Sequence, residues 1–97
     1  MDEEVFEVTT EELDDTWVVR PVGDVDVATA PFLRAHLTPI DGKLIVDLTG
    51  VTFLSSAGIS VLFDTYRRLG GGMTLGRPSD HVRMVLEVVG LEGLIEV

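Results

Sequence analysis

The serine pair Ser55-Ser56 is the part of the sequence that could carry chemistry most directly. It follows a run of strand-forming residues and precedes a helix-like segment, and sites in open α/β sheets favour this strand-to-helix position. A hydroxyl group there could belong to a ligand-binding or reaction site. It could equally do no more than cap the helix, a role that serine fills well. The residues alone favour capping and leave the other roles open.

The surroundings of the serines argue against an enzyme. A Ser-His-Asp hydrolase presents its nucleophile in a G-x-S-x-G turn, whereas this stretch reads Phe53-Leu54-Ser55-Ser56-Ala57-Gly58. The glycine run 70–72 follows a helix-like segment and precedes a strand-like one, which is the wrong order for a phosphate-binding loop. His36 and His81 lack the spacing of metal ligands, and the chain has no cysteine. We therefore expect no catalytic residues, no metal and no cofactor.

The charge of the chain excludes further classes of partner. Seventeen acidic residues against seven basic ones give the 97 residues a net charge of −10, so we expect no nucleic-acid partner and no anionic membrane surface. Eight of the acidic residues lie between Asp2 and Asp15, whereas segment 51–72 carries one aspartate and two arginines and is nearly neutral. No apolar run reaches 18 residues, and the acidic N-terminus is unlike a signal peptide. These features predict a cytoplasmic protein without membrane insertion.

The elements that must position the serines begin with two strands and a helix. Strand-like residues cover 5–8 and 17–22, with a turn expected at 11–15, and Pro21 suggests a sheet edge or a bulge. The sequence Thr29-Ala30-Pro31 predicts a helix from Ala30 to Leu37 with Thr29 as its cap. Asp24 and Asp26 fit the turn before it. The expected buried face of this helix consists of Phe32, Leu33 and Leu37.

The second half of the chain alternates strands and helices. We expect a buried strand at 43–48, a helix from Ser56 or Ala57 to Leu69, a short strand at 73–76 and a helix from Asp80 to Val89 capped by Ser79. The order β-β-α-β-α-β-α predicts a single α/β domain over residues 1–97, with helices packed on a mixed central sheet. The expected buried faces are Ile59, Leu62, Phe63, Tyr66 and Leu69 in the longer helix, and Val82, Val85, Leu86 and Val89 in the last one.

Two separated motifs resemble a known family. Asp47 to Ile59, reading DLTGVTFLSSAGI, closely resembles the STAS domain of bacterial anti-sigma factor antagonists. Gly23 to Arg34, reading GDVDVATAPFLR, resembles the other signature of that family, and Val82 to Leu94 resembles its third helix and exit. The resemblance covers nearly the whole chain. It implies a small α/β fold with a mixed central β-sheet and helices packed mainly on one face.

The resemblance also implies a function. Unphosphorylated antagonists of this family bind an anti-sigma factor that is also a serine kinase, and this binding frees the sigma factor. The kinase then phosphorylates a serine at the start of the second helix, which breaks the complex, and a phosphatase resets the cycle. The alternative is a non-switching STAS subunit of a larger assembly, such as a lipid-transport complex or a stress-sensing particle.

The phosphorylation site needs residue-by-residue comparison. Many family members read Asp-Ser-Ser-Gly or Asp-Ser-Thr-Gly, and this chain has Ser55 at the acidic position and Ala57 directly before Gly58. Only Ser56 keeps a matching hydroxyl group, so the resemblance predicts Ser56 as the acceptor and Ser55 as the second choice. If the acceptor must directly precede the glycine, the chain is not phosphorylated there, and Ala57 then favours the non-switching alternative.

The expected partner surface combines a loop with one stripe of the second helix. Helical spacing places Ser56, Ser60, Asp64 and Arg67 near one outward face. We expect Leu91, Leu94 and Ile95 to return to the core after the last helix. The chain also stops where many relatives add a further helix, and the missing cover could leave apolar surface near Leu91 and Leu94 exposed as a contact for a weak homodimer. The full set of predicted partner-binding residues is Asp24, Asp26, Thr29, Ser55, Ser56, Ala57, Gly58, Ser60, Asp64 and Arg67.

Overall fold

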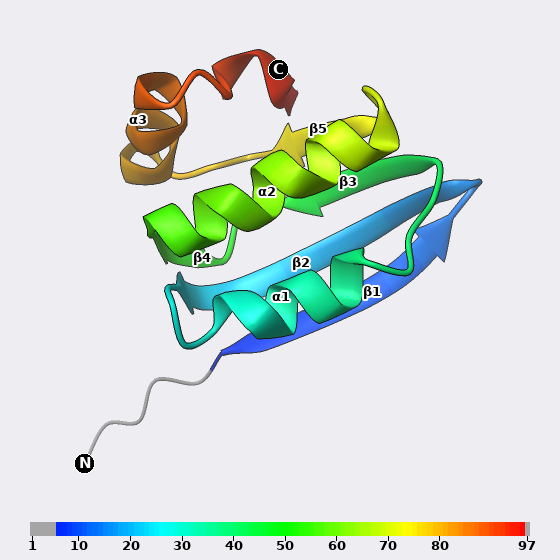
Figure 1. Ribbon diagram of the computed structural model, residues 1–97, viewed down its shortest axis with the longest axis horizontal. Coiled ribbons are helices and arrows are strands. Elements are labelled where there is room, and N and C mark those ends of the chain that lie inside the picture. The colour runs from blue at the N-terminus through cyan, green and yellow to red at the C-terminus, as the bar shows by residue number, and fades with distance from the viewer. Residues whose placement is uncertain (1–5, 97) are drawn as a thin grey trace.

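The computed structural model describes residues 6–96, which form a mixed sheet with helices on one face. The strands are β1 (Glu7–Leu13), β2 (Thr16–Val25), β3 (Lys43–Asp47), β4 (Val51–Leu54), β5 (Met73–Gly76) and β6 (Ile95–Glu96). The helices are α1 (Ala30–Leu37), α2 (Ser56–Leu69) and α3 (Asp80–Val88), with a 3-10 turn η1 (Glu92–Leu94) before β6. The strand order is β1-β2-β3-β5-β6, and β4 also pairs with β2 (Figure 1).

The long strand β2 organises the sheet because it has two successive neighbours on one side. Its first part, Thr16 to Val19, pairs in parallel with β3, and its last part, Gly23 to Val25, pairs in parallel with β4. Pro21 lies between these two ladders, where the parallel neighbour changes and a missing N–H group is tolerated. Of the two expectations for Pro21, the sheet edge is wrong, since β1 pairs antiparallel along the other side, whereas an irregularity does occur nearby, where the pairing with β4 shifts register between Gly23 and Asp24.

The fold class is confirmed, and the structure adds two strands to the predicted element order. Strand β4 and the two-residue strand β6 were missing from that order. The predicted turn at 11–15 is also wrong, because β1 continues to Leu13 and only Asp14 and Asp15 form the turn. Both aspartates have positive φ angles, 49° and 67°, a conformation that aspartate tolerates better than most residues. The predicted edge strand at 5–8 lies partly outside the described residues.

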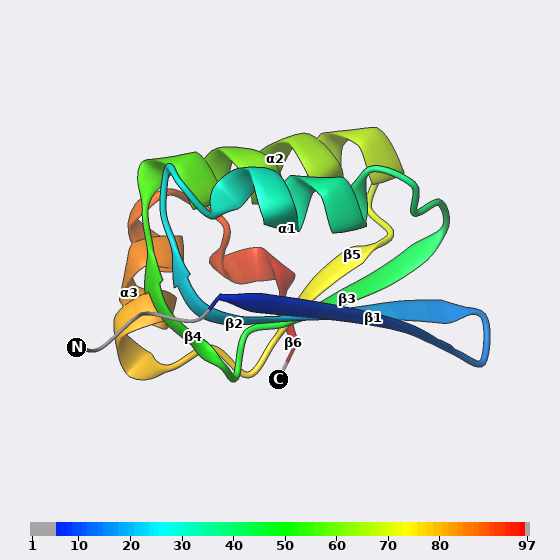
Figure 2. The same ribbon diagram turned by 90° about the horizontal axis from the view of Figure 1, so that it is seen from below.

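The core lies between the sheet and the helices. Figure 2 shows α1 and α2 side by side on one face of the sheet, with α3 at the end next to β4. Strands β2 and β3 contribute Val19, Leu44 and Val46, which are almost completely buried. The helices contribute Leu33 and Leu37 from α1, Val61 and Leu62 from α2, and Val82 and Leu86 from α3.

Some predicted core residues are exposed because packing buries only part of the apolar stripe on each helix. Phe32 is 63% exposed and Phe63 is 42% exposed, so both predictions of burial are wrong. Val89 is also exposed, whereas Thr65 is buried and donates its hydroxyl to the Val61 carbonyl oxygen. The expected return of the C-terminal segment to the core is confirmed, because Leu91 is buried and Leu94 and Ile95 are half-buried against the core, whereas the exposed apolar surface that a missing helix could leave near Leu91 and Leu94 is not found.

Candidate partner-binding site

The two serines at the start of α2 have different local roles. Ser55 is the residue before the helix, with extended backbone angles, and its Oγ accepts a hydrogen bond from the Gly58 N–H over 3.5 Å. Its own N–H donates to the Val25 carbonyl oxygen at 2.9 Å, which ties the start of the helix to the end of β2. Ser56 begins the helix and is exposed. The capping role predicted for this pair therefore belongs to Ser55, and the Ser56 side chain faces solvent.

Gly58 lets α2 lie close to the sheet. A Cβ atom at this position would come within 2.7 Å of both Leu54 Cδ1 and Val25 Cγ1, much closer than real Cβ atoms approach. Gly58 is accordingly buried, whereas Ala57 beside it is half-buried. The structure thus places Gly58 under the predicted partner surface, where it positions the neighbouring serines.

The loop between β2 and α1 is held by its own polar side chains. The Asp26 carboxylate accepts hydrogen bonds from the backbone N–H groups of Ala28 at 2.9 Å and Thr29 at 3.0 Å. The Thr29 hydroxyl donates to the Asp24 carbonyl oxygen at 2.6 Å and accepts from the Asp26 N–H at 2.9 Å. The hydrogen bond from the Thr29 backbone is the main cause that lowers the pKa of Asp26. The loop is therefore held in one conformation by hydrogen bonds to the Asp26 carboxylate, and the lowered pKa favours the ionised form of that group.

This arrangement corrects the predicted cap of α1. Thr29 has helical backbone angles, and its side chain makes no capping hydrogen bond to the helix. Its hydroxyl instead closes the loop, and the carboxylate of Asp26 satisfies the N–H groups that precede the helix. The helix begins at Ala30 as predicted, because Pro31 fits the first turn, where its missing N–H has no intrahelical partner.

Parallel pairing brings this loop to the serines. Val25 of β2 is paired with Leu54 of β4, so the chains that leave the two strands run side by side at the same sheet edge. The Thr52 hydroxyl donates to the Asp24 carboxylate and adds a side-chain link between the two strands. The loop residues Asp24, Asp26 and Thr29 therefore lie beside the start of α2, as predicted. The nearly neutral surface expected from segment 51–72 thus has two carboxylates next to it.

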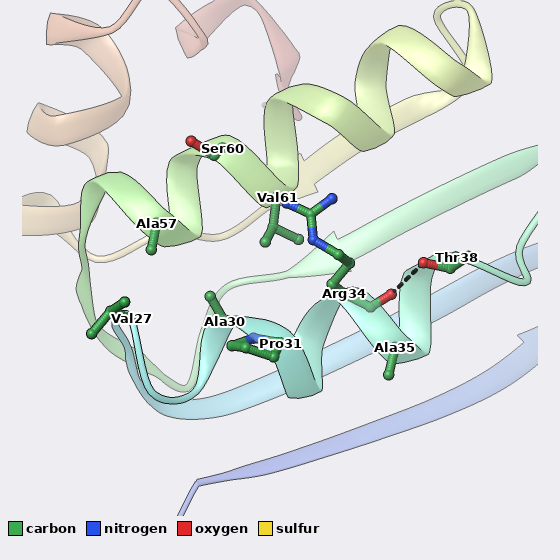
Figure 3. Close-up of a pocket in the computed structure, with 9 residues that line it drawn as sticks. All are labelled: Val27, Ala30, Pro31, Arg34, Ala35, Thr38, Ala57, Ser60 and Val61. Atoms are coloured by element: carbon green, nitrogen blue, oxygen red, sulfur yellow. Dashed lines mark hydrogen bonds between the residues drawn. The ribbon is translucent and has the colours of Figure 1, made fainter.

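A groove of about 610 Å³ runs between α1 and α2. Val27 and Ala57 lie at one end of it, and Arg34 extends from α1 toward α2 in the middle (Figure 3). The guanidinium of Arg34 forms an ion pair with the carboxylate of Asp64 at 3.1 Å, which bridges the two helices. The residues that line the groove are Val27, Ala30, Pro31, Arg34, Ala35, Thr38, Ala57, Ser60 and Val61.

The predicted stripe on α2 is exposed, and tertiary structure adds residues to it. Ser60, Asp64 and Arg67 all face solvent, and Ser60 lines the groove. Sequence reasoning missed Val27 and Arg34, which enter the surface from the loop and from α1. It also missed the exposure of Phe63, although a residue three after Ser60 and four before Arg67 shares their side of a helix.

Among residues 6–96, no helix is both long enough and apolar enough to cross a bilayer. Over the same described residues, no three histidine, aspartate or glutamate side chains come together in a way that could hold a metal ion.

Comparison with known proteins identifies the family. The model of the STAS domain matches residues 7–97, and the chain belongs to the STAS domain family. An anti-sigma-B factor antagonist of Bacillus subtilis is 28% identical over 85 residues, covering 81% of this chain and 78% of the relative. An anti-sigma-B factor antagonist of Staphylococcus aureus is 31% identical over 99 residues, covering 95% of this chain and 90% of the relative.

A solved structure supports the same assignment. The crystal structure of an anti-sigma factor antagonist from Mycobacterium paratuberculosis superimposes with a TM-score of 0.83 at 27% sequence identity. The match covers 94% of this chain and 83% of that structure. The resemblance inferred from the two sequence motifs is therefore confirmed at the level of family and fold.

Proposed function

We propose that the protein is an anti-sigma factor antagonist that acts by partner switching in the cytoplasm. It binds an anti-sigma factor that is also a serine kinase, is released when a serine is phosphorylated, and is reset by a phosphatase. It acts as a regulatory binding protein and not as an enzyme. The observation that carries the proposal is the exposed Ser56 hydroxyl at the first turn of α2, beside the preformed loop 24–29. Relatives that cover 81% and 95% of the chain are named anti-sigma-B factor antagonists, which supports the same function.

The site favours Ser56 over Ser55 as the phosphate acceptor. Ser55 is half-buried, and its Oγ faces the Gly58 N–H as the helix cap. Phosphorylation of Ser55 would therefore have to disturb the cap, whereas Ser56 is available to a kinase without any change in the helix.

A phosphate group on Ser56 would change the surface without unfolding the domain. It adds a charge of about −1.5 to −2 at neutral pH. The free N–H groups and the dipole at the start of a helix tolerate such a charge. A partner docked against Asp24, Asp26 and the start of α2 would meet a third negative group, and a mispaired charge at an interface can cost several kcal/mol. Because about 1.4 kcal/mol changes affinity tenfold, this is enough for a switch.

The first test is phosphorylation by the candidate kinase. We expect mass spectrometry after incubation with kinase and ATP to find one phosphate on Ser56. Ser56→Ala should abolish it, and the matched control Ser55→Ala should keep it. Phosphate on the Ser56→Ala variant would contradict the assignment of the acceptor.

The second test concerns the binding surface. Ser60→Arg and Asp64→Arg should each weaken kinase binding by about tenfold or more, because a bulky cation would enter the groove or break the bridge between Arg34 and Asp64. Glu12→Arg, at the hairpin end of β1, is the matched control and should bind normally. Circular dichroism should be unchanged in all three variants. Normal binding by both groove variants would remove this surface from the proposal.

A second candidate function rests on one residue. Ala57 occupies the position directly before Gly58, where many family members carry a hydroxyl group, and this favours a STAS subunit that does not switch. Such a subunit would belong to a larger assembly, such as a lipid-transport complex or a stress-sensing particle. Absence of phosphate after incubation with a kinase that binds the protein tightly would favour this second function.

A further inference from the structure

The outer face of α3 carries an apolar patch that the proposed function does not use. Met84 is 63% exposed and Val88 is 86% exposed, one turn apart on the helix. The neighbouring strand contributes Phe53, whose ring stacks on His81 with centroids 6.4 Å apart. A shallow hollow of about 280 Å³ follows this face. The residues that line the hollow are His81, Met84, Val85, Val88 and Val89.

This patch is separate from the residues that hold α3 in the core. Val82 and Leu86 are fully buried on the inner side of the helix. At about 100° per residue, Met84 and Val88 lie about 120–160° around the helix from these two anchors. Burying Val82 and Leu86 therefore leaves Met84 and Val88 facing out. Single exposed apolar residues are ordinary, but a contiguous group around a hollow is typical of a docking surface.

The patch lies across α2 from the groove that the proposed function uses. Figure 1 shows α1 on one side of α2 and α3 on the other. Phe53 precedes Ser56 by only three residues, so the patch starts close to the first turn of α2 but extends away from the groove. A partner on α3 could therefore bind independently of one that fills the groove.

The charges around the patch indicate the chemistry of its occupant. By helical geometry, Asp80 and Glu87 lie about 40° and 60° from Met84 on one edge of the patch, and Arg83 lies farther out on the same edge, about 100° from Met84. The two charges nearest the patch on this edge are therefore acidic, on a chain with a net charge of −10. A second copy of the chain would bring two acidic rims together, and an anionic bilayer would repel this face. A segment with basic residues beside its apolar ones would be complementary.

We propose that the patch formed by Phe53, His81, Met84, Val85 and Val88 is a second docking surface, and that its partner is an amphipathic helix of another protein flanked by lysine or arginine. Such a helix would place one apolar side chain in the hollow along α3 and its cations against Asp80 and Glu87. Laying an apolar helix face into an apolar groove is a common mode of peptide recognition.

The test uses a synthetic 18-residue helical peptide in which leucine forms one face and lysine the flanks. We expect calorimetry to show binding to the full chain, with NMR shifts centred on Met84 and Val88. A peptide of the same composition in scrambled order, and one with glutamate in place of lysine, should each bind at least about tenfold more weakly. Equal binding by the scrambled peptide would show attraction by charge alone and overturn the proposal.

Variants of the chain locate the site. The double variant Met84→Gln/Val88→Gln should weaken binding of the basic peptide by about tenfold or more, without any change in net charge. The matched control Leu13→Gln removes an exposed apolar residue at the end of β1, outside both the patch and the partner surface, and should bind normally. Equal loss in the control would overturn the assignment to α3. The proposal would also be overturned if sedimentation analysis showed a dimer that the double variant abolishes. In that case a second copy of the chain would occupy the patch.

Discussion

At the scale of single residues, Asp47 stabilises the turn that positions the site. It ends β3, is nearly buried, and accepts hydrogen bonds from the Thr49 N–H at 3.0 Å and the Thr49 hydroxyl at 2.6 Å. Two arginines from other parts of the chain approach the same carboxylate, Arg77 at 3.2 Å and Arg20 at 3.5 Å. Because β4 and α2 follow directly after this turn, Asp47 helps to determine where the serines lie.

The environment of Asp47 predicts a pH-dependent contribution to stability. Burial alone raises the pKa of this carboxyl, but the hydrogen bonds from Thr49 and the charge of Arg77 outweigh it, so the pKa is lowered below 3.8. A group whose pKa is lower in the folded state stabilises the fold fully above its unfolded pKa. That contribution is lost as the pH falls through the folded pKa.

Asp47→Asn should therefore lower the free energy of unfolding at pH 7 by about 1–3 kcal/mol, the scale of hydrogen bonds to a charged group. The difference from the wild type should begin to shrink in urea titrations below about pH 4, where the carboxyl of the unfolded chain becomes protonated, and should be lost as the pH falls through the lower pKa of the folded state. Glu12→Gln, which removes an exposed carboxylate on β1, is the control and should have little effect at either pH. A difference that stays constant with pH would contradict the role of the charge.

At the scale of elements, Arg68 joins the two helices that form the groove. Its guanidinium donates to the carbonyl oxygens of Leu37 at 2.8 Å and Ile40 at 2.7 Å. The first of these carbonyls belongs to the last turn of α1, where carbonyl groups have no partner within the helix. One side chain of α2 thus caps the end of α1, while Arg34 and Asp64 join the same helices nearer their starts. These contacts hold the two walls of the groove together.

Arg68→Met keeps the length and the apolar stem of this side chain but removes the donors. We expect a loss of about 1–3 kcal/mol in the free energy of unfolding, because two carbonyl groups lose a charged partner. Hydrogen exchange should quicken in α1 more than in β2 or β3. Arg67→Met, at the neighbouring exposed position, is the matched control and should leave both measurements nearly unchanged. Equal exchange in the two variants would contradict the capping role.

At the scale of the whole molecule, the charge of −10 acts against folding. The chain measures 41 × 27 × 21 Å. At about 10 mM salt the screening length is about 30 Å, so acidic groups across much of the molecule repel one another. At about 150 mM it is about 8 Å, and only neighbours interact. Compacting the chain at low salt therefore costs more electrostatic free energy than at high salt.

Thermal stability should consequently rise with salt. Scanning calorimetry in about 10 mM and about 150 mM NaCl should show a higher Tm at the higher concentration, and each kcal/mol relieved is worth about 4–8 °C for a domain of this size. The ion pairs of Arg20 with Glu11 and of Arg34 with Asp64 would be weakened by the same salt. A Tm that falls with salt would show that these local attractions outweigh the general repulsion.

Local chemistry made much of the site predictable. The apolar pattern of α2, the serine before it and the glycine after it predicted its bounds, and Ser79 predicted the start of α3. These signals are readable because a cap or a helical stripe depends on residues three or four positions apart. Phe32 and Phe63 were predicted wrongly by the same reasoning, since a pattern of apolar residues does not show which part of an apolar stripe packing buries.

The sequence by itself determined the class of fold, the family and the hydroxyl groups at the start of α2. Only the tertiary structure decided which surface surrounds them. Pairing of β2 with β4 brings loop 24–29 to Ser55, and the bridge from Arg34 to Asp64 spans thirty positions of sequence. Tertiary packing also turned Met84 and Val88 outward by burying the opposite side of α3. The physical reason is that these features depend on contacts between distant segments, which no local pattern of residues specifies.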